Sequence, residues 1–127
     1  MLKEFSVESR KKIEAIDVTS KVESLIGVKE GTAIVFVPHA TCALFVNEFE
    51  PNLVLDYEKL FALLRREKWA HDDIDDNAAA HLASALVGSS VVVPVEKGRL
   101  ALGVWQRIVL MELDGPRKRK VSLVLVR

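Results

Sequence analysis

The chain has 127 residues, half of them hydrophobic, and its 18 basic and 18 acidic residues give a net charge of zero. This length fits one domain spanning residues 1–127, and the apolar content excludes a disordered chain. The balanced charge argues against a nucleic-acid partner, which usually needs a basic excess. A lone cysteine, no targeting segment and apolar runs too short to cross a bilayer predict a soluble, cytoplasmic protein with no membrane partner.

The first half of the chain mixes strand and helix patterns. Polar and apolar side chains alternate over 3–8 and 12–18, which predicts two strands joined as a hairpin. A helix starting near Ser20 follows them. A continuous apolar run rich in β-branched residues at 32–37 then predicts a buried strand, and a second buried strand follows at 42–46.

The second half begins with helices and ends with strands. Pro51 suits the first turn of a second helix, because its missing N–H needs no partner there. An acidic loop, Trp69–Asp75, separates that helix from a third one at Asp76–Val87. Strands are then predicted at residues 90–95, 100–103, 108–113 and 120–126.

The irregular order of these elements predicts the fold class. It excludes regular alternation of strand and helix, and it favours an α+β domain with a mixed or antiparallel, sandwich-like β core and about three helices. The unbroken apolar runs Val91–Val95 and Val121–Val126 predict strands that are buried on both faces.

Three histidines are the main candidates for chemistry. His39 lies in the break between two predicted strands, His71 precedes the third helix, and His81 shares a face of that helix with Asn77. Three imidazoles with an open position form a common catalytic zinc site, and the neighbouring aspartates could orient them. Spacing alone favours the alternative that these are structural histidines, since it matches no short metal motif.

Other polar residues allow functional and structural interpretations side by side. Glu48 could be a general base or a metal ligand, or a polar residue at a strand end. Gln106, after Trp105, could line a pocket. Arg117 and Arg119 could clamp a phosphate, or they could protect a hairpin edge from aggregation.

Several short motifs occur together along most of the chain. They are His39-Ala40-Thr41-Cys42-Ala43, Asn47-Glu48, His71, Asp76-Asn77 with His81, Gly88-Ser89, Pro94, Gly98-Arg99-Leu100, Leu102-Gly103-Val104-Trp105-Gln106, Glu112, and Asp114-Gly115-Pro116-Arg117 with Arg119. In this combination and order the chain resembles the YjbQ family, whose members are often labelled secondary thiamine-phosphate synthase.

The resemblance implies an α+β homotrimer with sites near subunit boundaries. It implies one polar cleft where His39, His71 and His81 hold a divalent metal, zinc or magnesium, and act in catalysis with Glu48. The labelled reaction, a transfer, joins a hydroxymethylpyrimidine diphosphate to a thiazole phosphate and releases pyrophosphate. The substrate would then be a small phosphorylated metabolite, and the alternative is a non-catalytic metal-, anion- or metabolite-binding protein. The residues expected to bind the substrate or anion are Thr41, Asn47, Asn77, Gln106, Arg117 and Arg119.

Overall fold

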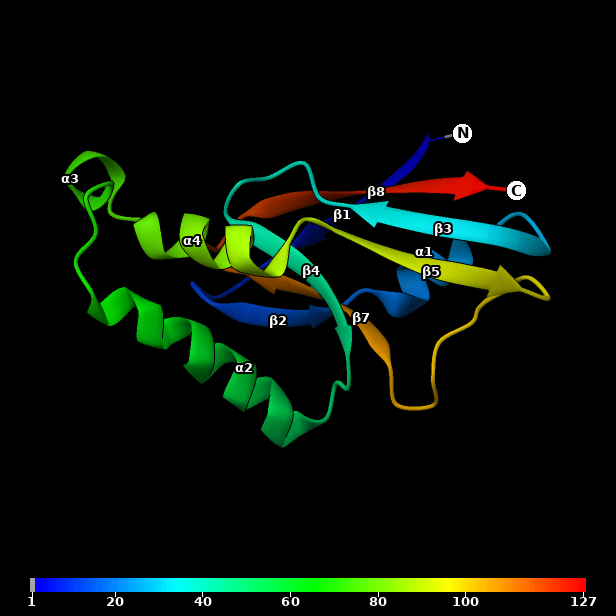
Figure 1. Ribbon diagram of the computed structural model, residues 1–127, viewed down its shortest axis with the longest axis horizontal. Helices are drawn as coiled ribbons and strands as arrows, with labels where there is room; N and C mark the ends of the chain where they lie inside the picture. Colours follow the sequence, from blue (N-terminus) through cyan, green and yellow to red (C-terminus); the bar gives the residue numbers. More distant parts are fainter. Residues whose placement is uncertain (1) are drawn as a thin grey trace.

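The computed structural model describes residues 2–127, which form eight strands, four α-helices and one 3-10 helix (Figure 1). The strands are β1 Leu2–Glu8, β2 Glu14–Asp17, β3 Glu30–Phe36, β4 Cys42–Asn47, β5 Ser90–Glu96, β6 Arg99–Leu100, β7 Arg107–Glu112 and β8 Lys118–Val126. The helices are α1 Thr19–Ser24, α2 Pro51–Leu63, the 3-10 helix η1 Leu64–Arg66, α3 Asp72–Asp75 and α4 Ala78–Val87.

The strands form two sheets in which every pairing is antiparallel. The larger sheet has the order β1-β8-β3-β5-β6, and the smaller has the order β2-β7-β4. The predicted α+β class with a sandwich-like core is therefore confirmed.

Strand β7 shows how the layers are stacked. Its side chains point alternately to the two faces of the smaller sheet. Ile108 and Leu110 pack into the core between the two sheets, whereas Val109 and Met111 pack beneath α2 and α4. The molecule thus has three layers: helices, the smaller sheet and the larger sheet. The continuous apolar run of β7 follows from its burial on both faces.

The larger sheet differs from the prediction for Val91–Val95 and Val121–Val126. Its strands alternate instead of being buried on both faces, and Val92 is 63% exposed while Val93 is buried. The reason is that only the inner face of this sheet is covered within the chain. The outer face carries the apolar side chains of Leu2, Ile34, Phe36, Val92, Val124 and Val126.

Two local elements also differ from the sequence prediction. The predicted acidic loop contains the short helix α3, where the Asp72 carboxylate accepts hydrogen bonds from the backbone N–H groups of Trp69 and Ala78, each at 3.0 Å. The predicted strand 100–103 shrinks to β6, because the Gln106 side chain accepts a hydrogen bond from Gly103 N and forms a turn. No helix within residues 2–127 is long and apolar enough to span a membrane.

Candidate functional site

Asp114 is the centre of a polar network at the end of β7, which we call the Asp114 network. Asn77, at the turn between α3 and α4, donates from Nδ2 to Asp114 Oδ2 at 3.2 Å. Asn77 Oδ1 lies 3.0 Å from Nε2 of His71. Lys12 Nζ contacts Asp114 Oδ1, and Arg117 donates to Asp114 Oδ2 at 3.1 Å. The turn after β7 and the α3–α4 segment are thereby joined.

This network fixes which nitrogen of His71 carries a hydrogen. A carboxylate only accepts hydrogen bonds, so the Asn77 amide presents its NH2 group to Asp114 and its carbonyl oxygen to His71. His71 must then donate from Nε2, and the lone pair of its neutral ring lies on Nδ1. Nδ1 is the atom of His71 that can take up a proton or bind a ligand.

His81 projects from α4 toward the same place. The rings of His71 and His81 meet edge to face, with centroids 5.0 Å apart and planes at 81°. The fold therefore brings together two of the three predicted histidines and Asn77.

The charge of Asp114 is stabilised although the residue is buried. Burial opposes its charged form, but hydrogen bonds from Lys12 and Asn77 and the charge of Lys12 outweigh that effect, so the pKa of Asp114 lies below its usual value. Asp114 is therefore an anion at neutral pH, and it orients Asn77 rather than accepting a proton itself.

His39 lies in the loop between β3 and β4 and contacts β8 instead of this pair of rings. Its Nε2 atom accepts a hydrogen bond of 2.9 Å from the backbone N–H of Lys120. Burial and the nearby positive charge of Arg119 hold the pKa of His39 below its usual value. A neutral imidazole has one lone pair, and here Lys120 uses it, so His39 presents only its Nδ1–H, as a donor.

A second set of buried polar residues, the Glu112 network, lies beneath His39. Arg119 is 4% exposed and donates to both carboxylate oxygens of Glu112 and to Oγ1 and the backbone oxygen of Thr41. Glu112 also accepts from Ser9 Oγ and from the backbone N–H of Asp114. Arg119 and Thr41 therefore hold the strand ends in place instead of facing solvent.

The Glu112 carboxyl is charged for the same reason as Asp114. Burial favours its neutral form, but hydrogen bonds from Arg119 and Ser9 prevail and lower the pKa of Glu112. The bond to Asp114 N connects the Glu112 network to the Asp114 network. The position of the Asn77 and His71 side chains thus depends on a buried ion pair.

The remaining predicted site residues lie at the opposite end of the smaller sheet. Asn47 pairs with Arg107 at one end of the β4–β7 ladder, and Cys42 pairs with Glu112 at the other. Five residue steps along a strand amount to about 17 Å. Asn47 accepts from the backbone N–H of its neighbour Glu48, and Gln106 accepts from Gly103. The predicted Glu48, Asn47 and Gln106 therefore form a group separate from the histidines within one chain.

The donor atoms do not fit the expected three-histidine metal centre within one chain. Among residues 2–127, no group of three or more His, Cys, Asp or Glu side chains is arranged to hold a metal ion. The lone pair of His39 is also engaged by Lys120. Only His71 and His81 remain as neighbouring imidazole donors.

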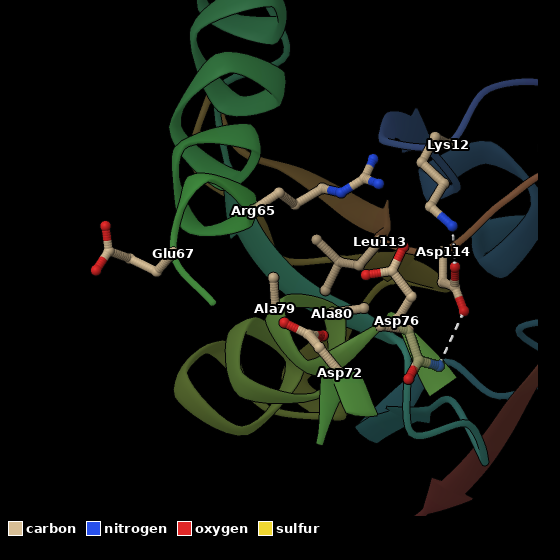
Figure 2. A pocket seen from close by; sticks show the side chains of 10 residues that line it. Lys12, Arg65, Glu67, Asp72, Asp76, Ala79, Ala80, Leu113 and Asp114 are labelled. Carbon is tan, nitrogen blue, oxygen red and sulfur yellow. Dashed lines mark hydrogen bonds and ion pairs between the residues drawn. The ribbon is translucent and has the colours of Figure 1, made fainter. Parts of the chain in front are cut away.

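A cavity of about 180 Å³ lies against the Asp114 network (Figure 2). Its lining includes the cations Lys12 and Arg65 and the carboxylates of Asp72, Asp76 and Asp114. The sequence argument missed Lys12, Arg65 and Asp114 as site residues. Asp114 stands in a turn motif that could have indicated it, whereas nothing in the spacing of Lys12 or Arg65 points to a shared cavity.

Cys42 is excluded as a nucleophile. The thiol is completely buried, and burial raises its pKa to about 11. A thiol with that pKa is protonated at neutral pH and is a poor nucleophile. Cys42 instead packs in the core between the sheets.

Known proteins resemble this chain over almost its whole length. A family model described as UPF0047 protein YjbQ-like matches residues 3–127. A UPF0047 protein of Archaeoglobus fulgidus is 47% identical over 122 residues, covering 93% of this chain and 95% of the relative. UPF0047 protein YugU of Bacillus subtilis is 38% identical over 126 residues, covering 94% of each chain.

Two solved structures have the same fold as this chain. A hypothetical protein from Aeropyrum pernix K1 is similar with a TM-score of 0.94 and 42% identity, covering 99% of this chain and 98% of that chain. A YbjQ-like protein of unknown function from Sulfolobus solfataricus P2 also gives a TM-score of 0.94, with 36% identity and 99% and 96% coverage. The similarity therefore includes both sheets and the strand ends that carry the two polar networks.

Proposed function

Because the chain belongs to the UPF0047 family of YjbQ-like proteins, we propose that it is a small-metabolite enzyme whose substrates carry phosphate groups. The observation that carries this proposal is the orientation of His71. Asn77 and Asp114 fix its tautomer and leave Nδ1 unbonded within residues 2–127. An imidazole that a hydrogen-bonded neighbour holds in one orientation is a common form of general acid or base.

The surrounding charges support a phosphorylated substrate. Lys12 and Arg65 line the cavity, and Asn77 of its wall is bonded directly to His71. Cations at a cavity wall stabilise phosphate oxygens and the charge that develops on a leaving phosphate.

The specific reaction we propose is the thiamine-phosphate synthase-like transfer implied by the family resemblance. The carbon–oxygen bond between a hydroxymethylpyrimidine and its diphosphate breaks, a new bond joins the pyrimidine to a thiazole phosphate, and pyrophosphate leaves with the bonding electrons. His71, protonated on Nδ1, would donate a proton to the leaving pyrophosphate.

The second candidate is a binding protein that does not turn its metabolite over. It is favoured by the engagement of the buried carboxylates, since Glu112 and Asp114 both accept several hydrogen bonds and neither is free to act as a base. Such a protein needs the cavity and its cations but no acid or base.

A homotrimer with shared sites is part of the proposal. The outer face of the larger sheet is apolar and uncovered within the chain, as Phe36 and Val92 illustrate. Large exposed apolar patches commonly mark subunit interfaces. Assembly of several copies would also allow the Asn47–Glu48 end of one ladder to approach the histidine end of another.

Pyrophosphate release tests the enzymatic proposal. Wild-type protein is incubated with the pyrimidine diphosphate and the thiazole phosphate, beside His71→Ala and the control Asp73→Asn, which changes an exposed residue of α3. We expect release by the wild type and the control, and a loss of about 100-fold or more in His71→Ala.

The other outcomes separate the candidates. Thermal stabilisation by either substrate without pyrophosphate release would support the binding protein instead. If neither substrate stabilises the wild type and no pyrophosphate appears, both candidates are wrong for these compounds.

A further inference from the structure

Three charged side chains of the cavity lining, Arg65, Glu67 and Asp76, have no partner within residues 2–127, and Arg65 and Asp76 point into the cavity. Within residues 2–127, neither Arg65 nor Asp76 makes a side-chain hydrogen bond or an ion pair, although both line the cavity. Figure 2 shows the Arg65 guanidinium entering from the η1 side and the Asp76 carboxylate from the α3–α4 side. Among the charges that point into the cavity, the described residues therefore leave one cation and one anion unpaired, on different walls.

The other charges of the lining are either paired or point away. Lys12 is paired with Asp114, and Asp72 accepts hydrogen bonds from two backbone N–H groups. Glu67 points away from the other lining side chains in Figure 2. Arg65 and Asp76 are consequently the charges left to decide which ligand the cavity prefers.

We propose that the cavity binds a small zwitterion, with a phosphate group on Arg65 and a cationic ammonium group on Asp76. The inference rests on the proposed function only in taking this cavity as a site for phosphorylated metabolites, because neither substrate of the proposed transfer carries an ammonium group. Arginine binds phosphate oxygens through paired N–H donors, and a carboxylate accepts strong hydrogen bonds from an ammonium.

The size of the cavity agrees with such a ligand. The cavity has a volume of about 180 Å³. Typical pockets for drug-sized molecules are larger, from about 300 Å³ upward. A compact molecule with its two charges a few bonds apart can therefore reach both walls.

Asp76 gives the cavity its selectivity. A phosphate without a cationic group would place a dianion near an unpaired carboxylate, and this repulsion opposes binding. A zwitterion replaces that repulsion with a charge-assisted hydrogen bond. Such a bond is worth enough to change affinity by about tenfold or more.

Calorimetric titration of the full chain tests this with three matched probes. O-phosphoethanolamine carries both charges, ethyl phosphate only the anion, and ethanolamine only the cation. We expect wild-type protein to bind phosphoethanolamine about tenfold or more tightly than ethyl phosphate, and not to bind ethanolamine measurably.

Single substitutions test whether Asp76 binds the ammonium group and Arg65 binds the phosphate. Asp76→Asn should remove the preference for phosphoethanolamine over ethyl phosphate, and Arg65→Gln should abolish binding of both. The neighbouring changes Asp75→Asn and Arg66→Gln alter residues outside the cavity and should leave affinities unchanged. Circular dichroism and thermal melting confirm that each variant is folded.

Three results would overturn the inference: no binding of phosphoethanolamine by the wild type, equal binding of ethyl phosphate, or an unchanged preference in Asp76→Asn. Failure of the proposed reaction is distinguishable, because it removes pyrophosphate release and leaves the probe preference intact. Conversely, a protein that releases pyrophosphate but binds both phosphates equally retains its proposed activity and loses this ligand class.

Discussion

The orientation of one side chain, His71, depends on a hydrogen-bonded neighbour that is itself oriented by a buried charge. Asn77 links His71 to Asp114, and its amide can satisfy both partners in only one orientation. The chemistry available at His71 Nδ1 is therefore set by Asn77 and Asp114 as much as by the imidazole itself.

Replacing Asn77 by Ala should release the His71 tautomer. In wild-type protein we expect the neutral His71 ring to carry its hydrogen on Nε2, because Asn77 Oδ1 accepts it. In Asn77→Ala we expect a mixture of both tautomers. Long-range ¹⁵N–¹H NMR of histidine-labelled protein measures this, with Asn52→Ala, at the exposed start of α2, as the control. A wild-type ring that is protonated on Nδ1 would contradict the orientation.

His39 should make stability depend on pH in the mildly acidic range. Its pKa is lower in the folded protein than its unfolded value of about 6.5, chiefly because of burial and Arg119. The unfolded chain then binds the proton more readily, so the contribution of His39 is complete above about pH 6.5 and is lost as the pH falls toward the lowered pKa.

Urea unfolding from pH 7.5 to 5 tests this at a fixed protein concentration. In His39→Gln the amide oxygen can still accept from Lys120 N, and the group does not titrate. As the pH decreases from 7.5 to 5, we expect the free energy of unfolding to decrease less steeply in this variant than in the wild type. If the free energy of unfolding depended on pH equally in both proteins, His39 would not contribute to the pH dependence of stability.

Among the elements, strand β7 packs against both the helices and the larger sheet, and it ends beside the Asp114 network. It lies between β2 and β4, packs on both faces, and leads directly into Asp114. Its last residue, Glu112, pairs with Arg119 of β8, which belongs to the other sheet. One buried ion pair thus joins the two sheets next to the residues that orient His71.

Glu112→Ala should destabilise the protein strongly. Removing one member of a buried pair leaves the other charge without compensation, which typically costs about 3–5 kcal/mol. The matched control is Glu4→Ala, which breaks an exposed ion pair to Lys120 and should cost at most about 1 kcal/mol. Chemical denaturation measures both. Similar losses in the two variants would mean that the Glu112 pair has no special structural role.

At the scale of the whole molecule, the larger sheet leaves an apolar face that the single chain does not cover. The side chains that point outward from β3, β5 and β8 are apolar at several adjacent positions, and the register places Ile34 opposite both Val92 and Val124. A contiguous patch of this kind fits the proposed contact between copies of the chain.

Val92→Lys should weaken that assembly. Val92 is 63% exposed at the middle of the patch, and a lysine there would place a charge at the centre of an apolar contact. Light scattering after size-exclusion chromatography should give three times the 14.2 kDa chain mass for the wild type and a smaller species for Val92→Lys. Leu55→Lys, on the exposed side of α2, is the control. A monomeric wild type would remove the trimer proposal.

The sequence by itself determined the class of fold and most of its elements. Local periodicity decides whether a segment buries one face of a strand or one stripe of a helix, and this information lies within a few residues. The run at residues 108–113 and the helix at 78–87 were predictable for that reason. The short motifs from His39 to Arg119 were sufficient to identify the family.

Tertiary structure alone decided how the candidate residues are grouped. The β4–β7 register places Asn47 and Glu48 far from His39 within one chain. The packing of the helices beside the strand ends places Lys12, Arg65 and Asp76 around one cavity. Those residues are distant in sequence, and each could equally be a solvated surface charge until the strands are paired. The hydrogen-bond partners of His39 and Arg119, which are Lys120 N and Glu112, were likewise visible only in the folded chain, because the sequence does not show which atoms are already bonded.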